Sequence, residues 1–166
     1  MVVGSSGAGK TTLANRLGAR LSLPVVHLDV HYWLPGWTAP AGNNWRGRMN
    51  ALADGPEWIL DGNFAEGFEF RMPRADSLVW LDYPRLTCLR RIVARAIRER
   101  GAERPDLPKG CPEQLDLPTL RFAWDFPAKT RPLIVDGIAR FGAHLKVTRL
   151  TSDREADAFL ATVSNT

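Results

Sequence analysis

A nine-residue run near the start of the chain, GSSGAGKTT at residues 4–12, constrains the fold more than any other feature. It follows two valines and runs into LANRLGARL, in which Leu13, Leu17 and Leu21 recur every four residues. That spacing places the three leucines on one face of a helix. The sequence therefore predicts a short apolar strand, a glycine-rich turn and an amphipathic helix in succession, a unit typical of sheets with alternating strands and helices.

The run also matches G-x-x-x-x-G-K-T, the Walker A pattern of phosphate-binding loops. Glycines let backbone N–H groups surround the β-phosphate, and the following helix adds the positive end of its dipole. We expect Lys10 to reach the β- and γ-phosphates and Thr11 to give its hydroxyl to Mg²⁺. The alternative is a glycine-rich surface turn. The residues expected to bind ATP are Gly4, Ser5, Ser6, Gly7, Ala8, Gly9, Lys10, Thr11 and Thr12.

Length and composition favour one domain over residues 1–166, at a cytoplasmic location. Hydrophobic residues make up 45% of the chain and the mean hydropathy is -0.20. No run approaches the roughly 18 apolar residues of a membrane span, and the start lacks a signal-peptide pattern. We therefore expect no membrane partner. Cys88 and Cys111 form no CxxC pair, so the sequence offers little support for a zinc site or a disulfide framework.

Four further apolar runs end in or near polar residues, as buried parallel strands do. They are PVVHLD (24–29), WILDGN (58–63), SLVWLDYP (77–84) and HLKVTRL (144–150). Helical patterns lie between and after them, at 44–53, 85–100, 118–141 and 153–163, the last with Asp153 as its expected N-cap. Alternating strands and helices predict a doubly wound α/β sheet. Trp58, Trp80 and Trp124 fall within these patterns and are expected in the core, and His27 and His144 are expected to be structural.

Two segments interrupt the alternation. One is LDVHYWLPGW (28–37) with its continuation TAPAGNN, which is too irregular for a helix or a strand, and the other is GAERPDLPKGCPEQLDLP (101–118). Long irregular segments in a compact domain are usually functional or disordered loops. We interpret residues 29–56 as an acceptor-binding segment and residues 100–118 as a lid.

Three aspartates at strand ends are candidates for the carboxylate that a magnesium nucleotide site needs. Asp61 is favoured, because the following Gly62 permits close approach. For Asp82, a capping or structural role is as good an interpretation as a catalytic one. Asp29, placed in the second strand, is the expected anchor of an acceptor. His31, Trp33 and Trp37 join it in the acceptor-binding set, with the alternative that the two tryptophans pack a cap against the core.

Basic residues concentrate between residues 85 and 104, where seven arginines face two glutamates, a net charge of +5. This suggests a phosphate-rich partner, either nucleotide or nucleic acid. Arg91, Arg95 and Arg98 fall within about 60° on the helix. They are interpreted as lid arginines that close over triphosphate, and the alternative is a solvated basic face.

The segments GSSGAGKTTLA, HLDVHYWLPGW, WILDGN, RMPRADSLVWLDYPRLTCLRRI and RPDLPKGCPEQLDL, in this order, resemble the adenylate-kinase-like P-loop proteins of the DNA topology modulation (FlaR-related) group. The resemblance covers nearly the whole chain. More broadly, the chain looks like a small-molecule or nucleoside monophosphate kinase. That resemblance implies a five-stranded parallel sheet of order 2-3-1-4-5 and a mobile acceptor region and lid.

The broader resemblance also assigns roles. Asp61 matches the aspartate beside the magnesium, and Arg91 and Arg95 match the R-x-x-x-R of the helix that enters the lid, so Lys10, Asp61, Arg91 and Arg95 are the expected catalytic set. Where these kinases usually follow Asp-Gly with an aromatic, a proline and an acceptor-binding arginine, this chain has Asn63 and Phe64. We expect Asn63 on the acceptor side, and Arg71 or Arg74 as the source of the missing charge.

The leading hypothesis is an ATP- and Mg²⁺-dependent phosphotransferase acting on a small acceptor, with Asp29 or His31 taking or orienting the acceptor's proton. A second hypothesis is an ATP-dependent nucleic-acid-binding regulator, for which the basic helix and the aromatic residues provide phosphate contacts and base stacking. A GTPase switch lacks its guanine-reading N/T-K-x-D motif in this sequence.

Overall fold

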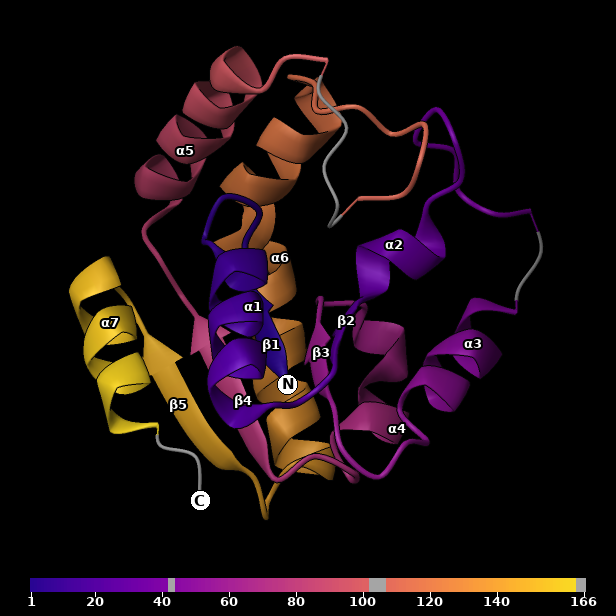
Figure 1. Cartoon of the computed structure of the whole chain (residues 1–166), viewed down its shortest axis with the longest axis vertical. Coiled ribbons are helices and arrows are strands. Elements are labelled where there is room, and N and C mark those ends of the chain that lie inside the picture. Colours follow the sequence, from indigo (N-terminus) through magenta and orange to yellow (C-terminus); the bar gives the residue numbers. More distant parts are fainter. Residues whose placement is uncertain (42–43, 102–106, 164–166) are drawn as a thin grey trace.

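A computed structural model of the chain describes residues 1–41, 44–101 and 107–163. Five parallel strands form one sheet in the order β2-β3-β1-β4-β5, which confirms the predicted fold class and strand order (Figure 1). The strands are β1 (Val2–Gly4), β2 (Val25–His27), β3 (Ile59–Asp61), β4 (Ser77–Leu81) and β5 (Lys146–Leu150). The helices are α1 (Lys10–Leu21), α2 (Leu28–Tyr32), α3 (Trp45–Leu52), η1 (Ala65–Gly67), α4 (Phe68–Arg71), α5 (Arg85–Arg98), α6 (Leu117–Phe141) and α7 (Asp153–Thr162).

Helices cover both faces of the sheet, and Figure 1 shows α1 in front of it and α6 behind. Because successive side chains of a strand point to opposite faces, Val2 and Val3 of β1 belong to different cores. Val2 packs with the buried face of α1 and with Leu160 of α7. Val3 packs with side chains of α4 and α6, among them Phe68 and Phe126.

A third, smaller cluster lies beside the edge of the sheet formed by β2. It joins Leu28, Leu60 and the buried face of α3, Trp45 and Met49. Leu28 is completely buried, and a Cβ at Gly62 would lie 3.0 Å from the Leu28 side chain, so glycine permits this close packing.

The aromatic stretch 28–37 is more regular than predicted. Strand β2 ends at His27, and α2 begins at Leu28, so Asp29 lies in the first turn of a helix and not in the strand. The burial of Leu28 in the third cluster explains why so short a helix forms there. A tight hairpin then pairs Leu34 with Thr38, with Gly36 and Trp37 at positive φ.

The C-terminal half confirms the helix predicted over residues 118–141 and corrects two further predictions. Helix α6 is one continuous element of 25 residues, capped by the Asp116 side chain, which accepts a hydrogen bond from the Thr119 N–H. Ser152, and not Asp153, caps α7. Trp124 was predicted in the core but is 51% exposed on α6, where the Arg85 guanidinium lies 4.8 Å from its ring centre. Among the described residues, no helix is long and apolar enough to cross a membrane.

Candidate functional site

The glycine-rich loop (residues 4–12) joins β1 to α1 at the carboxyl end of the sheet. Its conformation requires glycine at Gly7, where φ is +77° and a Cβ would lie 2.4 Å from the Cys88 carbonyl oxygen. The Lys10 ammonium folds back over the loop and donates to the Ser5 carbonyl at 3.1 Å. The loop therefore brings two sources of positive charge together: the N–H groups at the amino end of α1 and the Lys10 ammonium.

Asp61 meets Thr11 beneath this loop. The Thr11 hydroxyl donates to Asp61 Oδ2 at 2.9 Å, and the carboxylate is 5% exposed. Asp61 Oδ1 is buried with no hydrogen-bond partner among the described residues. A buried carboxylate oxygen without a donor is costly unless a ligand or an ion supplies the partner.

This pair fits a magnesium ion. Among the described residues, no three His, Cys, Asp or Glu gather as a complete metal site. Mg²⁺ keeps several waters and is usually held by one or two protein ligands together with substrate phosphates. The Thr11 hydroxyl and the unpartnered oxygen of Asp61 are therefore the groups that would hold it.

His27 adds a contact to this site that the sequence did not predict. It ends β2 and stands opposite Asp61 in the strand register. Its Nδ1 lies 2.9 Å from Asp61 Oδ2, and its Nε2 lies 3.1 Å from the Asn15 side-chain oxygen on α1. The imidazole thus bridges Asp61 and the first helix. The only signal for this in the sequence is that both residues end neighbouring strands.

Asn63, predicted on the acceptor side, binds the glycine-rich loop. Its side-chain oxygen accepts from the Gly4 N–H at 3.0 Å, and its side-chain nitrogen donates to the Gly4 carbonyl at 2.8 Å. Both polar groups of the amide are thus used to fix the first residue of the loop against the end of β3.

Arg71, the predicted source of an acceptor-binding charge, is completely buried. Its guanidinium donates to the carbonyls of Gly62 at 3.0 Å and Phe64 at 2.8 Å, and also to the carbonyl of Asn63. Burial lowers the pKa of Arg71 to about 9, so the side chain is still charged at neutral pH. The structure corrects the prediction: this charge holds the backbone after β3 and is not exposed to a ligand. The alternative, Arg74, lies at the surface and pairs with Asp54.

A pocket of about 570 Å³ lies beside the glycine-rich loop. Gly7, Gly9 and Thr12 form one side of it, and Arg91, Arg95 and Arg98 of α5 line another. The structure thus brings all three predicted lid arginines to one cavity that touches the loop. Residues 102–106 of the predicted lid lie outside the described part of the chain, and the end of the predicted segment, from Leu117, belongs to α6.

Each pocket arginine has an acidic partner. Arg91 pairs with Asp153 of α7, Arg95 Nε donates to Glu113 at 2.9 Å, and Arg98 pairs with Glu99 at 2.7 Å. The Arg91 guanidinium also lies 5.0 Å from the centre of the Tyr83 ring. Burial and the nearby Asp153 carboxylate raise the pKa of Tyr83 to about 12, so its hydroxyl stays protonated and donates to Asp153.

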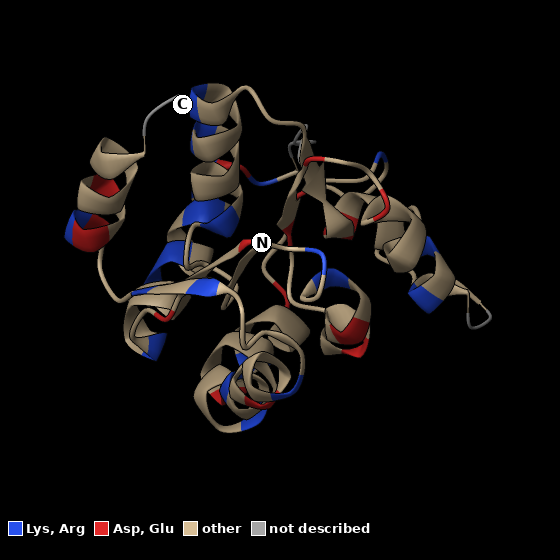
Figure 2. Ribbon diagram, turned by 90° about the horizontal axis from the view of Figure 1, so that it is seen from below, with Lys and Arg blue, Asp and Glu red and all other residues tan. Residues whose placement is uncertain are grey.

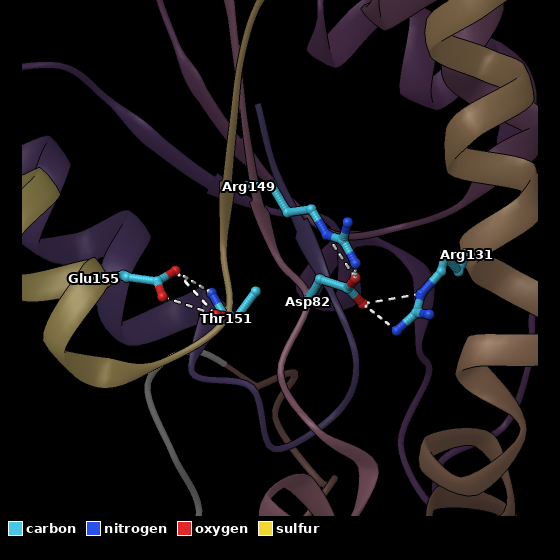
Figure 3. Close-up of polar contacts among 5 residues, drawn as sticks. All are labelled: Asp82, Arg131, Arg149, Thr151 and Glu155. Carbon is cyan, nitrogen blue, oxygen red and sulfur yellow. Dashed lines mark hydrogen bonds and ion pairs between the residues drawn. The ribbon is translucent and has the colours of Figure 1, made fainter.

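Asp82 follows β4 and forms an ion-pair network away from this pocket. Figure 3 shows Arg131 of α6 and Arg149 of β5 on either side of the carboxylate. Arg131 binds one oxygen at 2.9 Å and Arg149 binds the other, while the Asp82 side chain is 1% exposed. Pro84 occupies the N-cap position of α5 and no side-chain cap bond forms there. Among the alternatives, these contacts support a structural role for Asp82, not capping.

The predicted acceptor side lies around α2. Asp29 is partly buried, and this burial raises its pKa, which the Lys10 ammonium opposes and the Asp61 carboxylate reinforces. The structure thus brings Asp29 into the electrostatic neighbourhood of Lys10 and Asp61. Burial, followed by the charges of Arg48 and His27, lowers the pKa of His31.

The aromatic residues of this region contact one another in a chain of rings. Ring centres of Trp33 and Trp37 are 5.9 Å apart, and Trp33 also contacts Tyr32 at 4.8 Å. Tyr32 in turn contacts Trp45 and Phe64. The Trp37 indole N–H donates to the Pro112 carbonyl at 3.1 Å. Both tryptophans are partly buried, so each is held by packing and still presents some surface.

No family profile matches the sequence, and comparison with curated proteins gives no match. Solved structures do share the fold. YorR protein from Bacillus subtilis, in complex with phosphorylated GDP, is 15% identical, with a TM-score of 0.57 over 96% of this chain and 90% of that one. Shikimate kinase from Bacteroides thetaiotaomicron is 20% identical, with a TM-score of 0.50 over 96% and 92%. The likeness is to a P-loop kinase-like fold.

Proposed function

We propose that the chain is a phosphotransferase that moves the γ-phosphate of ATP, with Mg²⁺, to a small acceptor. The observation that carries the proposal is the unpartnered, buried oxygen of Asp61, which lies beside the Thr11 hydroxyl next to the glycine-rich loop that carries Lys10. Two structures with the same fold support it, since YorR holds a phosphorylated nucleotide and shikimate kinase is named for phosphorylation of a small molecule.

Each group has a role in phosphoryl transfer, which needs positioning and charge neutralisation more than covalent chemistry. The glycine-rich loop and Lys10 bind the β- and γ-phosphates. Thr11 and Asp61 would hold Mg²⁺, which would supply charge neutralisation for the same phosphates. His27 keeps the Asp61 carboxylate in place, and Arg95 lines the pocket from the α5 side, where it would meet phosphate oxygens.

The acceptor lies on the opposite side of Lys10, against α2. Asp29 is the residue that binds or deprotonates the acceptor hydroxyl, because the charge of Lys10, which holds the transferred phosphate, lowers the pKa of this carboxyl against the effect of burial. A raised carboxyl pKa is typical of groups that exchange protons in catalysis. Trp33 and Trp37 form the apolar wall of this side. With Arg71 buried, the acceptor is proposed to be a neutral or weakly charged hydroxyl compound and not a nucleoside monophosphate.

Nucleic-acid binding, implied by the resemblance to the DNA topology modulation group, receives less support. Binding of a phosphate backbone needs a stripe or patch of basic residues, and Arg91, Arg95 and Arg98 of α5 instead line the pocket beside the glycine-rich loop. Figure 2 shows Lys and Arg spread over several elements, with Asp and Glu interspersed among them.

The test is nucleotide turnover with Mg²⁺ and a panel of small hydroxyl compounds, using ATP and GTP in parallel. We expect acceptor-dependent release of nucleoside diphosphate, reduced by about 10²–10³-fold in Lys10→Ala, the range seen when a preorganised charge donor is removed. Lys129→Ala is the control, because Lys129 lies on the surface and pairs with Asp125. Absence of nucleotide binding by the native chain would refute the proposal, as would duplex DNA binding that persists at moderate salt with no acceptor stimulation.

A further inference from the structure

Four consecutive residues, 110–113, each bind another part of the molecule. Their first three contacts go to the hairpin that follows α2, which we call the aromatic loop (residues 33–38). The Gly110 carbonyl accepts from the Gly36 N–H at 2.8 Å, the Cys111 thiol donates to the Leu34 carbonyl at 3.2 Å, and the Pro112 carbonyl accepts from the Trp37 indole at 3.1 Å. The fourth contact is made by Glu113, which accepts from Arg95 of α5.

These contacts are close, and two of the four residues, Cys111 and Glu113, are buried. Gly110 has φ +76°, and a Cβ there would lie 2.9 Å from the Pro35 ring, so the two backbones approach as near as glycine allows. Cys111 is completely buried and Glu113 is 4% exposed. The segment 110–113 and the aromatic loop therefore form a packed junction between regions about 75 residues apart in the sequence.

Arg95 extends this junction to the pocket. It lines the cavity beside the glycine-rich loop, and its side chain is 29% exposed. A guanidinium has five N–H donors in a rigid fork, so it can hold a carboxylate through Nε and still offer its outer nitrogens to an anion. Glu113 thus fixes the orientation in which Arg95 faces the pocket.

We propose that Glu113 is a positioning residue for Arg95, and that the segment 110–113 couples nucleotide binding in the pocket to the conformation of the aromatic loop on the acceptor side. This inference rests on the proposed function, because it requires a nucleotide in that pocket. Phosphate oxygens that bind Arg95 act on Glu113 through the shared guanidinium, and the three contacts of residues 110–112 transmit the change. Coupling between two sites acts in both directions, so a change that loosens the aromatic loop should also weaken nucleotide binding.

The junction also explains a choice of residue types. Gly110 is required by its positive φ and by the approach of Pro35, and Cys111 and Glu113 make their contacts through their side chains. A simple surface connection would have no use for a buried glutamate. A purely structural Glu113 would stabilise the chain, but it would not make the aromatic loop respond to a ligand on the other side of the site.

The experiment is hydrogen exchange by mass spectrometry on the full chain, with and without Mg²⁺ and a non-hydrolysable ATP analogue. The Gly36 N–H donates directly to Gly110, so a peptide covering residues 33–38 reports on the junction. Nucleotide affinity is measured first by calorimetry. We expect the analogue to change exchange in this peptide by about five-fold or more, the lower end of typical coupling.

Glu113→Gln keeps the shape and removes the charge, and it should abolish most of that response and weaken nucleotide binding several-fold. Trp37→Phe, which removes a contact outside the pocket, should also weaken nucleotide binding. If Glu113→Gln does not fold, Trp37→Phe alone serves as the test variant. Glu69→Gln is the matched control, since Glu69 pairs with Arg46 away from the junction. It should leave both quantities unchanged.

The outcomes separate the two proposals. If the native chain binds no nucleotide, the proposed function and the coupling both fail. If nucleotide binds but does not change exchange at residues 33–38, the coupling is wrong while the proposed function stands. The same holds if nucleotide changes this exchange in Glu113→Gln and Trp37→Phe as much as it does in the native chain. If the variants lower thermal stability without changing the nucleotide response, Glu113 is only structural.

Discussion

Replacing Arg71 tests whether this buried guanidinium holds the backbone after β3 or serves a ligand. Three backbone carbonyls, those of residues 62–64, depend on it. Hydrogen bonds to a charged group contribute about 1.5–3 kcal/mol each, and exchanging a buried charge for an apolar side chain returns about 1–4 kcal/mol. The three bonds together amount to about 4.5–9 kcal/mol, so after the recovered cost of charge burial Arg71→Met should lower the free energy of unfolding by about 4 kcal/mol.

The measurement is urea unfolding followed by circular dichroism. With a slope of about 2 kcal/mol per molar urea, the midpoint should fall by about 2 M. Arg71→Lys, which keeps a charge but loses the planar fork, should fall between the native chain and Arg71→Met. It provides the comparison if Arg71→Met does not accumulate as folded protein.

Arg74→Met is the control for the general loss of an arginine in this part of the chain. Arg74 is at the surface, where it contacts Asn50 and Asp54, and surface pairs contribute about 0–1 kcal/mol. If Arg71→Met costs no more than Arg74→Met and loses only acceptor-dependent turnover, the guanidinium serves the acceptor after all, and the structural role assigned to it is wrong.

Three further substitutions have defined outcomes. Asp29→Asn should abolish turnover and raise the thermal midpoint at neutral pH. The pKa of Asp29 is raised in the folded chain, so the native carboxyl binds its proton more tightly there and costs stability as pH rises through that pKa. Below about pH 4 the carboxyl is protonated in both states, so the higher midpoint of the variant should disappear. Asp82→Asn should lower the free energy of unfolding by about 1–3 kcal/mol in the same urea assay, because the network of Figure 3 loses its central charge; an effect no larger than that of the exposed Asp157→Asn would contradict this. Gly7→Ala should cost clearly more stability than Gly9→Ala, although both have positive φ, because only at Gly7 does a Cβ meet backbone, at 2.4 Å from Cys88; equal thermal midpoints would refute that steric argument.

The sheet could be predicted because its signals are local. Strands β2, β3 and β4 are largely apolar runs that end at or just before a polar residue, and parallel strands bring those ends to one edge. Thr11 and Asp61 could be anticipated for this reason, and the structure places them in contact. Magnesium binding by the pair stays a prediction.

Burial and long-range contacts could not be predicted in the same way. RMPR offers two arginines of identical chemistry, and only the packing of α4 beneath the loop after β3 decides that the first is inside and the second outside. Helix α2 has too few residues for a periodic pattern, so tertiary burial of Leu28 determines it. The junction between residues 33–38 and 110–113 joins two irregular segments, and nothing in either shows that they meet.

The two free cysteines lie on opposite sides of the candidate site. Cys88 packs beneath the glycine-rich loop, and Cys111 lies in the segment that binds the aromatic loop. Neither thiol can meet a reagent in solution until its own segment opens, and local openings have free energies of their own. The two thiols are therefore built-in probes of local opening. The alkylation rate of Cys88 measures how often the phosphate side opens, and that of Cys111 measures how often the acceptor side does.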